Sequence, residues 1–285
     1  MNNYEFCAAY IEGLFPEKGV KLLDYGCGAG HIVQLLRRAG FDAYGCDQFY
    51  EGGDRTNEVA EELRGSYVLR MEGNRIPFPD GAFDLVLSNQ VLEHVADLDI
   101  VLAETRRVLK PGGQVLSLFP DAGVWREGHC GIPFLHWFPK RSGRMRTWYA
   151  LAGRSLGLGL HKDDKPRSVW AADFCNWLDA WCYYRSYAEI AADFGRHFGP
   201  IEHIESEYLD ARYPAARNLP RGLKAFIVRK LAGNVFVCRR PATEAIRTSR
   251  PRAANQLPRS GVAVGSIQSQ RERLKSRTLG TQPFT

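Results

Sequence analysis

The chain has 285 residues, of which 45% are hydrophobic and 25% are charged. This length and composition are ordinary for a soluble globular protein with one large domain or two small ones. No apolar run approaches the ~20 residues that span a bilayer, and residues 1–6 lack a basic, apolar signal region, so we expect no transmembrane segment and no secretory leader. Seven scattered cysteines without a C-x-x-C pair favour a reducing cytoplasm over a disulfide framework or a zinc site.

The formal net charge of +6 is concentrated near the C-terminal end. Residues 239–285 hold ten Lys and Arg residues against two Glu residues, which leaves residues 1–238 at about −2 by the same count. The body of the chain therefore gives no general argument for nucleic-acid binding. Residues 241–285 are rich in Arg, Ser, Pro, Thr and Gln and lack apolar periodicity, so we predict a disordered basic tail there.

In chain order, the first 120 residues alternate between helical and extended patterns. An amphipathic helix is expected over residues 4–14, and a strand over 20–25 leads through a glycine turn into a helix over 32–39. Further strands are expected at 41–46, 67–71, 82–88 and 114–119, with a helix at 98–109 that Lys110-Pro111-Gly112-Gly113 ends. Such alternation predicts a doubly wound, mostly parallel α/β sheet covered by helices on both faces.

Residues 121–184 interrupt this alternation. All six tryptophans lie between residues 125 and 181, and the stretch is too long for a loop, so we predict a helical, aromatic-rich insertion after the fifth strand. In it, Val169, Phe174, Trp177, Trp181 and Tyr184 are expected on one helix face. Residues 186–189 then form a capping box for a helix, and 201–208 and 234–238 are predicted as a closing antiparallel pair of strands. Residues 1–120 and 185–240 would thus form one seven-stranded Rossmann-like domain.

The sequence DYGCGAG at residues 24–30 indicates which class of ligand this sheet binds. Gly26, Gly28 and Gly30 follow an apolar strand and precede a helix, as in nucleotide-binding turns. A dinucleotide site requires G-x-G-x-x-G, but His31 stands in the place of the last glycine, and Asp24 would repel a pyrophosphate. Asp24 suits an ammonium group instead. S-adenosylmethionine has an amino acid tail and no phosphate, so it fits this turn better.

Three further motifs follow in order: GCD at 45–47, IPFPDGAFDLVLSNQVLEHV at 76–95 and LKPGG at 109–113. On these motifs the chain resembles class I S-adenosylmethionine-dependent methyltransferases, in particular the group that includes ubiquinone- and menaquinone-biosynthesis methyltransferases. The resemblance covers residues 18–120 by motif and 186–238 by pattern only. It implies a Rossmann-like sheet, S-adenosyl-L-methionine as cofactor, and methyl transfer that in this family is most often to oxygen.

The resemblance also implies a set of cofactor-binding residues at the ends of the strands. Asp24 would reach the cofactor's ammonium, and Asp47, about 20 residues beyond Gly26, would accept both ribose hydroxyls. The other members of the set are the glycines 26, 28 and 30 against the methionine part, Glu72 and Gly73 against the adenine, and Asn89 and Gln90 at the methyl-transfer floor. Glu72 stands where relatives carry a shorter Asp.

His94 and His129 are the catalytic candidates. An unperturbed pKa near 6.5 suits His94 for removing a proton from an acceptor, with a structural role as the alternative. His129 follows the fifth strand, near Asp121, Cys130 and His136, at the edge where open α/β sheets bind ligands; the spacing there matches no common zinc pattern. In some relatives an E-x-x-E-H run supplies metal ligands, but Gln90 replaces the first Glu, so no metal is expected.

The leading hypothesis is a methyltransferase that acts on a small-molecule, sugar or lipid-linked acceptor, with residues 121–184 covering the acceptor site. An NAD(P)-dependent oxidoreductase is disfavoured by Asp24 and His31. A non-catalytic S-adenosylmethionine-binding protein stays open because of Glu72, Gly73 and Gln90. A basic amphipathic stretch around Trp148 leaves peripheral membrane contact open, whereas a nucleic-acid partner is not expected.

Overall fold

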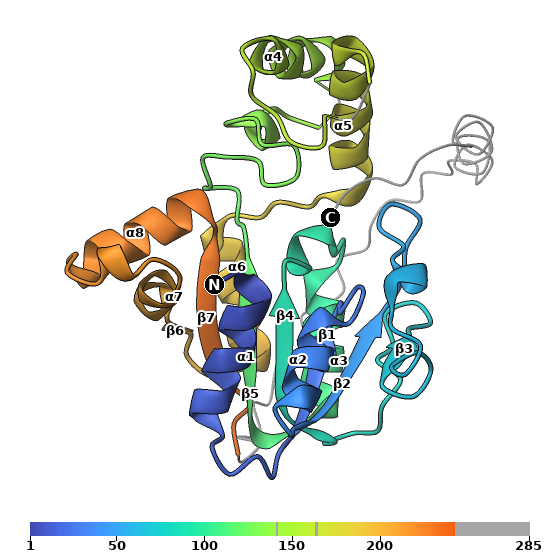
Figure 1. Cartoon of the computed structure of the whole chain (residues 1–285), viewed down its shortest axis with the longest axis vertical. Helices are drawn as coiled ribbons and strands as arrows, with labels where there is room; N and C mark the ends of the chain where they lie inside the picture. Colours follow the sequence, from blue (N-terminus) through green and yellow to red (C-terminus); the bar gives the residue numbers. More distant parts are fainter. Residues whose placement is uncertain (141, 163–164, 243–285) are drawn as a thin grey trace, which may run out of the picture. The chain divides into compact units, whose positions relative to one another are not determined.

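A computed structural model of the chain describes residues 1–140, 142–162 and 165–242. Its centre is one seven-stranded sheet in the order β3-β2-β1-β4-β5-β7-β6 (Figure 1). The strands are β1 (Lys21–Tyr25), β2 (Asp42–Asp47), β3 (Val68–Arg70), β4 (Phe83–Asn89), β5 (Leu109–Phe119), β6 (Glu202–His203) and β7 (Asn234–Arg239). Strands β1 to β5 run parallel, and β7 is antiparallel to both β5 and β6. The predicted seven-stranded, mostly parallel sheet is confirmed, and the predicted tail lies outside the described residues except for its first two positions.

Helices pack on both faces of the sheet because successive strand side chains point to opposite faces. In β1, Leu22 belongs to one hydrophobic core and Leu23 to the other. The first core takes residues from α1 (Asn3–Leu14), α2 (His31–Arg38), α7 (Glu205–Arg212) and α8 (Arg221–Leu231), and the second from α3 (Leu98–Val108) and α6 (Tyr187–His197). The doubly wound architecture expected from the sequence is therefore present.

The end of α3 differs from the sequence prediction. We expected residues 110–113 to end the helix and the next strand to begin at residue 114, but β5 begins at Leu109, directly after α3 ends at Val108. Phe83 of β4 pairs with Leu109, and the register shifts before the next pair, Leu85 with Gln114. Gly112 has a φ of +78°, which glycine adopts without a side-chain penalty. The glycines thus form an irregularity within a strand instead of a separate turn.

The strand predicted over residues 201–208 is wrong for most of its length. Only Glu202–His203 is extended, and α7 begins at Glu205. Ile204 and Tyr208 are both buried, and their spacing of four residues suits one face of a helix. The Tyr208 ring packs edge-on against Phe6 of α1, with 4.9 Å between ring centroids. The apolar residues here fit both periods, and packing against α1 decides for the helix.

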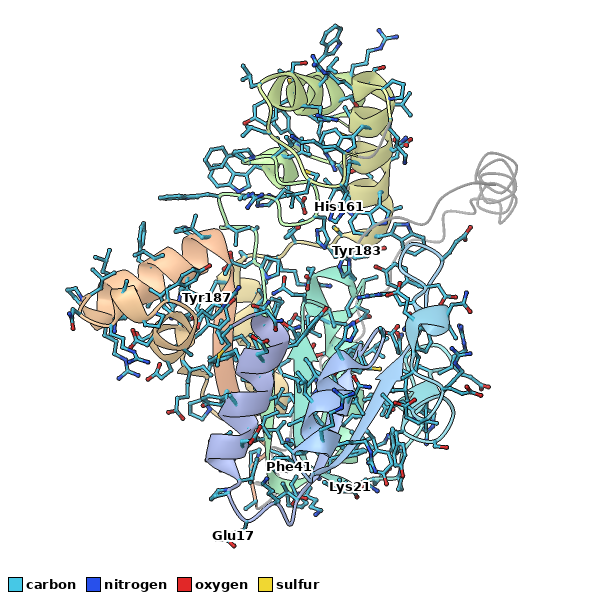
Figure 2. The ribbon with its side chains drawn as sticks, in the orientation of Figure 1. Glu17, Lys21, Phe41, His161, Tyr183 and Tyr187 are labelled. Atoms are coloured by element: carbon cyan, nitrogen blue, oxygen red, sulfur yellow. The ribbon has the colours of Figure 1, made fainter. Side chains whose placement is uncertain are left out.

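Between β5 and α6 the chain forms a short turn, η3 (Leu135–Trp137), and two helices, α4 (Gly143–Ser155) and α5 (Arg167–Trp181). These helices lie beyond the carboxyl ends of the parallel strands (Figure 1). Tyr183 is at that end in Figure 2, whereas Lys21 and Phe41 mark the opposite end, where β1 and β2 begin. None of the helices in the described ranges is long and apolar enough to cross a membrane.

The expected apolar face of α5 is only partly correct. Trp170 and Phe174 are buried, but Val169 is 45% exposed and Tyr184 lies beyond the end of the helix. The hydrogen bonds from this part of the chain to the rest of the molecule include two that reach loops beside the sheet. The Trp177 indole donates to the carbonyl of Gly52 at 3.1 Å, and the Tyr183 amide donates to the carbonyl of Glu93 at 2.6 Å.

Candidate functional site

The glycine turn joins β1 to α2 in a conformation that requires glycine. Gly26, Gly28 and Gly30 have φ values of +73°, +50° and +77°. A Cβ atom at Gly26 would lie 2.4 Å from both Cγ atoms of Val91, closer than carbon atoms can approach. The amides of Gly26 and Cys27 both donate to the carbonyl of Cys46, which fixes the turn against the end of β2. Glycine at position 26 is therefore required both by the left-handed backbone and by the close packing of Val91.

Asp24 is the buried carboxylate of this turn. It lies at the penultimate position of β1, and the residue is 4% exposed. Burial raises the pKa of Asp24 well above its usual range, and the nearby charge of Asp47 raises it further. A cation beside Asp24 would remove this penalty. The first amides of α2 lie across the turn, where Gly30 has no capping side chain, so the two ends of an amino acid zwitterion find opposite charges here.

Asp47 ends β2 and faces the same turn. One carboxylate oxygen accepts a hydrogen bond from the Gly28 amide at 2.8 Å, and the other accepts one from the Phe49 amide at 2.7 Å. Burial raises the pKa of Asp47, and these two amide donors oppose that shift. Each oxygen of a carboxylate has a second lone pair, so both can still accept a hydroxyl. The backbone donors hold the carboxylate in one orientation.

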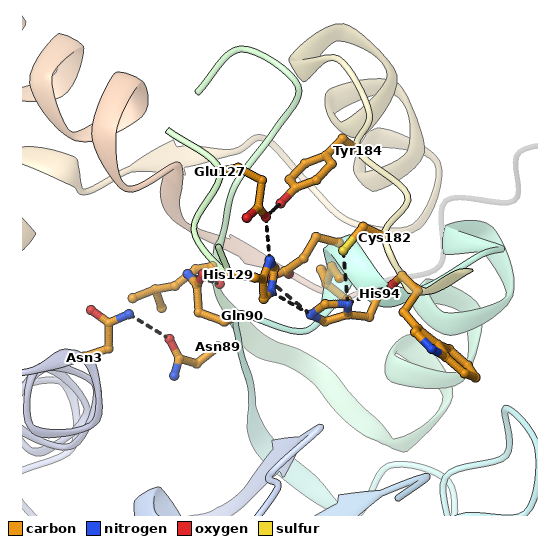
Figure 3. Close-up of polar contacts among 12 residues, drawn as sticks. Asn3, Asn89, Gln90, His94, Glu127, His129, Cys182 and Tyr184 are labelled. Atoms are coloured by element: carbon orange, nitrogen blue, oxygen red, sulfur yellow. Dashed lines mark hydrogen bonds and ion pairs between the residues drawn. The ribbon is translucent and has the colours of Figure 1, made fainter. Parts of the chain in front are cut away.

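The remaining predicted cofactor residues lie at the ends of β3 and β4. The Met71 amide donates to the carbonyl of Asp47 at 2.8 Å, which places exposed Glu72 and Gly73 beside the end of β2. Asn89 ends β4 and accepts a hydrogen bond from Asn3 at 3.4 Å (Figure 3). Gln90 has a φ of +57°, an uncommon value for a residue with a side chain. All nine predicted cofactor residues therefore lie at the carboxyl ends of β1 to β4.

The two predicted catalytic histidines meet directly. His94 ends the turn η2 (Leu92–His94), and its Nε2 atom lies 3.2 Å from Nε2 of His129 (Figure 3). Nδ1 of His94 is 2.8 Å from the carbonyl oxygen of Trp181, and Nδ1 of His129 is 2.6 Å from a carboxylate oxygen of Glu127. A carbonyl and a carboxylate only accept hydrogen bonds, so both Nδ1 atoms carry hydrogen. The two Nε2 atoms then face each other.

Glu127 organises this cluster. Its buried carboxylate accepts hydrogen bonds from the Tyr184 hydroxyl and the Cys130 amide, each at 2.6 Å, in addition to the one from His129. Burial opposes ionisation of Glu127, but these donors and the charge of His129 outweigh it and lower the pKa of Glu127 to about 2. Burial likewise opposes protonation of His129, yet Glu127 raises the pKa of that imidazole. Glu127 and His129 therefore form a buried ion pair in which the hydrogen bond to Nδ1 fixes the orientation of the imidazole ring.

His94 remains the neutral partner of this pair. Burial lowers the pKa of His94 to about 4, and the charge of His129 acts in the same direction. One proton on Nε2 of His129, donated to Nε2 of His94, accounts for the 3.2 Å separation. Without that proton, two lone pairs would face each other.

Sequence reasoning missed four members of this cluster. Glu127, Cys182 and Tyr184 were not considered as site residues, and Glu93 was considered only as part of the E-x-x-E-H run. Glu93 is 1% exposed, and neither of its carboxylate oxygens has a hydrogen-bond partner within the described ranges. The Sγ atom of Cys182 lies 3.8 Å from Nδ1 of His94, a contact between residues 88 positions apart. No local pattern in the sequence could indicate such contacts.

An acid before a glycine turn, a second acid at the end of β2 and a closing antiparallel strand beside β5 fit the α/β fold of S-adenosylmethionine-dependent methyltransferases better than a dinucleotide-binding fold. Comparison with known proteins agrees with this class. Residues 23–117 match the family model described as a methyltransferase domain.

A curated ubiquinone biosynthesis O-methyltransferase of Paramagnetospirillum magneticum is 36% identical over 132 residues, which cover 44% of this chain and 51% of that protein. A protein of the same name from Sinorhizobium medicae is 32% identical over 102 residues, which cover 35% and 41%. The chain thus spans about half or less of the length of these curated relatives. A solved S-adenosylmethionine-dependent methyltransferase from Mesorhizobium loti aligns with 84% of this chain and 100% of its own, at 15% identity and a TM-score of 0.49.

Residues 23–117 therefore match a methyltransferase domain, and their relatives and motifs are those of class I methyltransferases, whose cofactor is S-adenosylmethionine. The residues present fit this cofactor. Among the described residues, buried Asp24 has no cationic partner, and an ammonium would supply one. The N-terminus of α2 has no side-chain cap at Gly30, so its first amides can serve the cofactor's carboxylate.

Proposed function

We propose that the protein transfers a methyl group from S-adenosylmethionine to an oxygen atom of a small-molecule acceptor, including sugars and lipid-linked compounds. The observation that carries the proposal is the pair of carboxylates on either side of the glycine turn, the buried Asp24 and the partly buried Asp47. An ammonium and two ribose hydroxyls are the groups that two such acceptors select. The matched methyltransferase domain contains both residues.

The nine predicted cofactor residues at the carboxyl ends of β1 to β4, here called the cofactor edge, bind S-adenosylmethionine and orient it. Asp24 holds the ammonium, the first amides of α2 hold the carboxylate, and Asp47 holds the ribose. Glu72 and Gly73 contact the adenine, and Asn89 and Gln90 lie below the reacting carbon. When bound, S-adenosylmethionine supplies a methyl group on a positively charged sulfur, so the work left to the protein is alignment of the acceptor and exclusion of water.

The acceptor side is the cluster around His94 and His129, which we propose as the catalytic residues. Once His129 has released its Nε2 proton to solvent, one Nε2 lone pair of the two histidines takes the proton of an acceptor hydroxyl. Glu127 then stabilises the imidazolium that forms on His129. Residues 121–184 cover the acceptor in this proposal, because they supply Glu127, His129 and the Trp181 carbonyl that fixes His94.

Two other functions make different predictions at the same site. An NAD(P)-dependent oxidoreductase would have to place a pyrophosphate beside Asp24, which like charges disfavour. A non-catalytic S-adenosylmethionine-binding protein would keep the cofactor edge but would not need an ordered histidine pair. The names of the curated relatives, which are O-methyltransferases of ubiquinone biosynthesis, support oxygen as the acceptor atom.

Titration calorimetry on the purified full chain tests the cofactor. We expect micromolar binding of S-adenosylmethionine or its demethylated product and no comparable binding of NAD(H) or NADP(H); selective nicotinamide binding would overturn the proposal. Incubation with methyl-labelled cofactor and fractionated cell extract then tests transfer. Label should enter a small-molecule or lipid fraction, and a His129→Ala variant that still binds cofactor should transfer little. Tight cofactor binding with no transfer to any fraction would favour the non-catalytic function.

A further inference from the structure

We propose that His94, His129 and Cys182 bind a zinc-class divalent metal ion, with the carboxylate of Glu93 as the fourth donor. One potential ligand atom from each of the first three residues lies within 4.8 Å of the others. The three residues come from separate places in the fold: η2 after β4, the segment after β5, and the residue that follows α5. Only the complete fold brings these three residues together.

The distance between the histidines fits a shared metal ion. Zinc binds imidazole nitrogen at about 2.0–2.1 Å in tetrahedral geometry, which places two nitrogen ligands about 3.3 Å apart. The two Nε2 atoms are 3.2 Å apart. Sγ of Cys182 lies on the Nδ1 side of His94, at 3.8 Å from that atom, so a rotation of the thiol side chain toward the histidine pair would complete the set.

Both histidine rings are already oriented by second partners. Glu127 accepts the Nδ1 hydrogen of His129, and the carbonyl of Trp181 accepts that of His94. In metal sites, a histidine ligand regularly donates its other ring hydrogen to a carboxylate or a backbone carbonyl, which fixes the tautomer and directs the ligating nitrogen. Tyr184 and the Cys130 amide in turn hold Glu127. The arrangement directs two Nε2 atoms to one point.

Glu93 supplies an independent observation. Its carboxylate is fully buried, and among the described residues neither oxygen has a hydrogen-bond partner. One oxygen lies 3.9 Å from Nε2 of His94. A buried carboxylate without partners is costly unless a cation or a donor accompanies it. A metal ion at the histidine pair would satisfy Glu93 and give the site a second anionic ligand beside the Cys182 thiolate.

The donor types select the kind of ion. Two imidazoles, one thiolate and one carboxylate suit zinc or a similar borderline metal, whereas magnesium and calcium prefer oxygen ligands alone. The sequence argument against a metal concerned the run from Gln90 to His94 and the spacing of His129, Cys130 and His136. The proposed site uses neither set as a whole, since Cys182 joins from 88 positions beyond His94.

This inference does not depend on the proposed methyl transfer. The ion would take the place of the proton between the two Nε2 atoms, and with four protein donors it would occupy a closed site of the structural type. The cofactor edge at Asp24 and Asp47 uses no residue of the metal site. Loss of metal binding and loss of cofactor binding are therefore separate results, and each can fail while the other holds.

Tag-free full-length protein, stripped with a chelator and reconstituted with cobalt(II), provides the test. We expect one equivalent per chain, visible bands of tetrahedral cobalt, and a near-ultraviolet charge-transfer band from the Cys182 thiolate. Cys182→Ser should remove the charge-transfer band, and Glu93→Gln should weaken zinc binding at least tenfold in equilibrium dialysis. Cys175→Ser, at another buried cysteine of α5, is the matched control and should change neither signal.

Two kinds of result would contradict the proposed metal site. If folded wild-type protein takes up less than a tenth of an equivalent of zinc or cobalt at micromolar concentrations, the metal site does not exist. If the charge-transfer band persists in Cys182→Ser or disappears in Cys175→Ser, the ligand set is wrong. Circular dichroism of each metal-free variant shows whether it is folded. The test uses the conservative substitutions Cys182→Ser and Glu93→Gln because His129→Ala removes a larger buried side chain.

Discussion

The two halves of the candidate site are built in different ways. The central part of the cofactor edge, residues 24 to 47, lies on β1 and β2, which are neighbours in the chain and pair in register, with Asp24 opposite Gly45. The histidine cluster joins residues 93–94, 127–129 and 182–184, which only the complete fold brings together. The first half depends on local backbone conformation and the second on long-range packing. Substitutions in the cofactor edge should therefore change ligand binding, and those in the cluster should first change stability.

Removal of Glu127 should have the largest effect and tests the stability half of the comparison. Glu127→Ala leaves the His129 imidazolium buried without its counter-ion, so the free energy of unfolding should fall by about 3–5 kcal/mol. Urea unfolding at neutral pH with a chelator present measures it. Glu58→Ala is the control, since Glu58 forms a surface ion pair with Arg55 and its loss should cost at most about 1 kcal/mol. Equal small losses for both variants would show that the cluster does not hold the fold together.

Asp47→Ala tests the expectation that a substitution in the cofactor edge changes ligand binding. The variant loses hydrogen bonds from a charged group to the ribose, so cofactor affinity should fall by about 1.5–3 kcal/mol while the unfolding transition changes little. Asp42→Ala is a matched control, because Asp42 begins the same strand β2 at the opposite end of the sheet and is exposed. Calorimetry with S-adenosylmethionine compares the two. Unchanged affinity in Asp47→Ala would remove its assigned role.

Asp24→Asn should change cofactor affinity and the stability of the cofactor-free protein in opposite directions. The pKa of Asp24 is raised in the folded, cofactor-free protein, so the folded state holds that proton more tightly than the unfolded chain. The resulting stability is complete below pH 3.8 and is lost as the pH rises through the folded pKa. Each tenfold difference in proton affinity between the folded and unfolded states contributes about 1.4 kcal/mol.

At pH 8 without cofactor, Asp24→Asn should therefore be more stable than the wild type, and near pH 3 the two should agree. Its affinity for S-adenosylmethionine should nevertheless be lower at pH 8. Denaturant unfolding at both pH values and calorimetry at pH 8 measure these effects. A variant that is less stable at pH 8 would mean that Asp24 is not an isolated buried charge.

The difference between the two halves also explains which parts of the site could be predicted from the sequence. The glycine turn was predictable because left-handed backbone conformations demand glycine at fixed positions, and Asp24 and Asp47 stand at fixed distances from it. Strands β1 to β4 followed from apolar runs between turn residues. The helix α7 was missed because the spacing of Ile204 and Tyr208 fits a strand as well as a helix, and only the packing against α1 decides between them.

The acceptor side shows where sequence reasoning stopped. His94 and His129 were chosen separately, each for its chemistry and its place after a strand, and nothing in the sequence indicated that their Nε2 atoms meet. Cys182 and Tyr184 belong to an aromatic stretch whose path back over the sheet is set by tertiary contacts. Partners of this kind can be predicted from a single sequence only when a common motif fixes their spacing, and none does here.

Ser186→Ala should have the smallest effect, because it removes a contact that is local. The Ser186 side chain accepts a hydrogen bond from the Glu189 amide, and Glu189 accepts one from the Ser186 amide, which together cap α6. Loss of an N-cap costs about 1 kcal/mol. Ser155→Ala, at the exposed last residue of α4, should cost less. Since α6 packs on the sheet face away from the glycine turn, cofactor affinity should be the same in both variants; a cofactor defect in Ser186→Ala would mean that the face packed by α6 also sets the geometry of the cofactor edge.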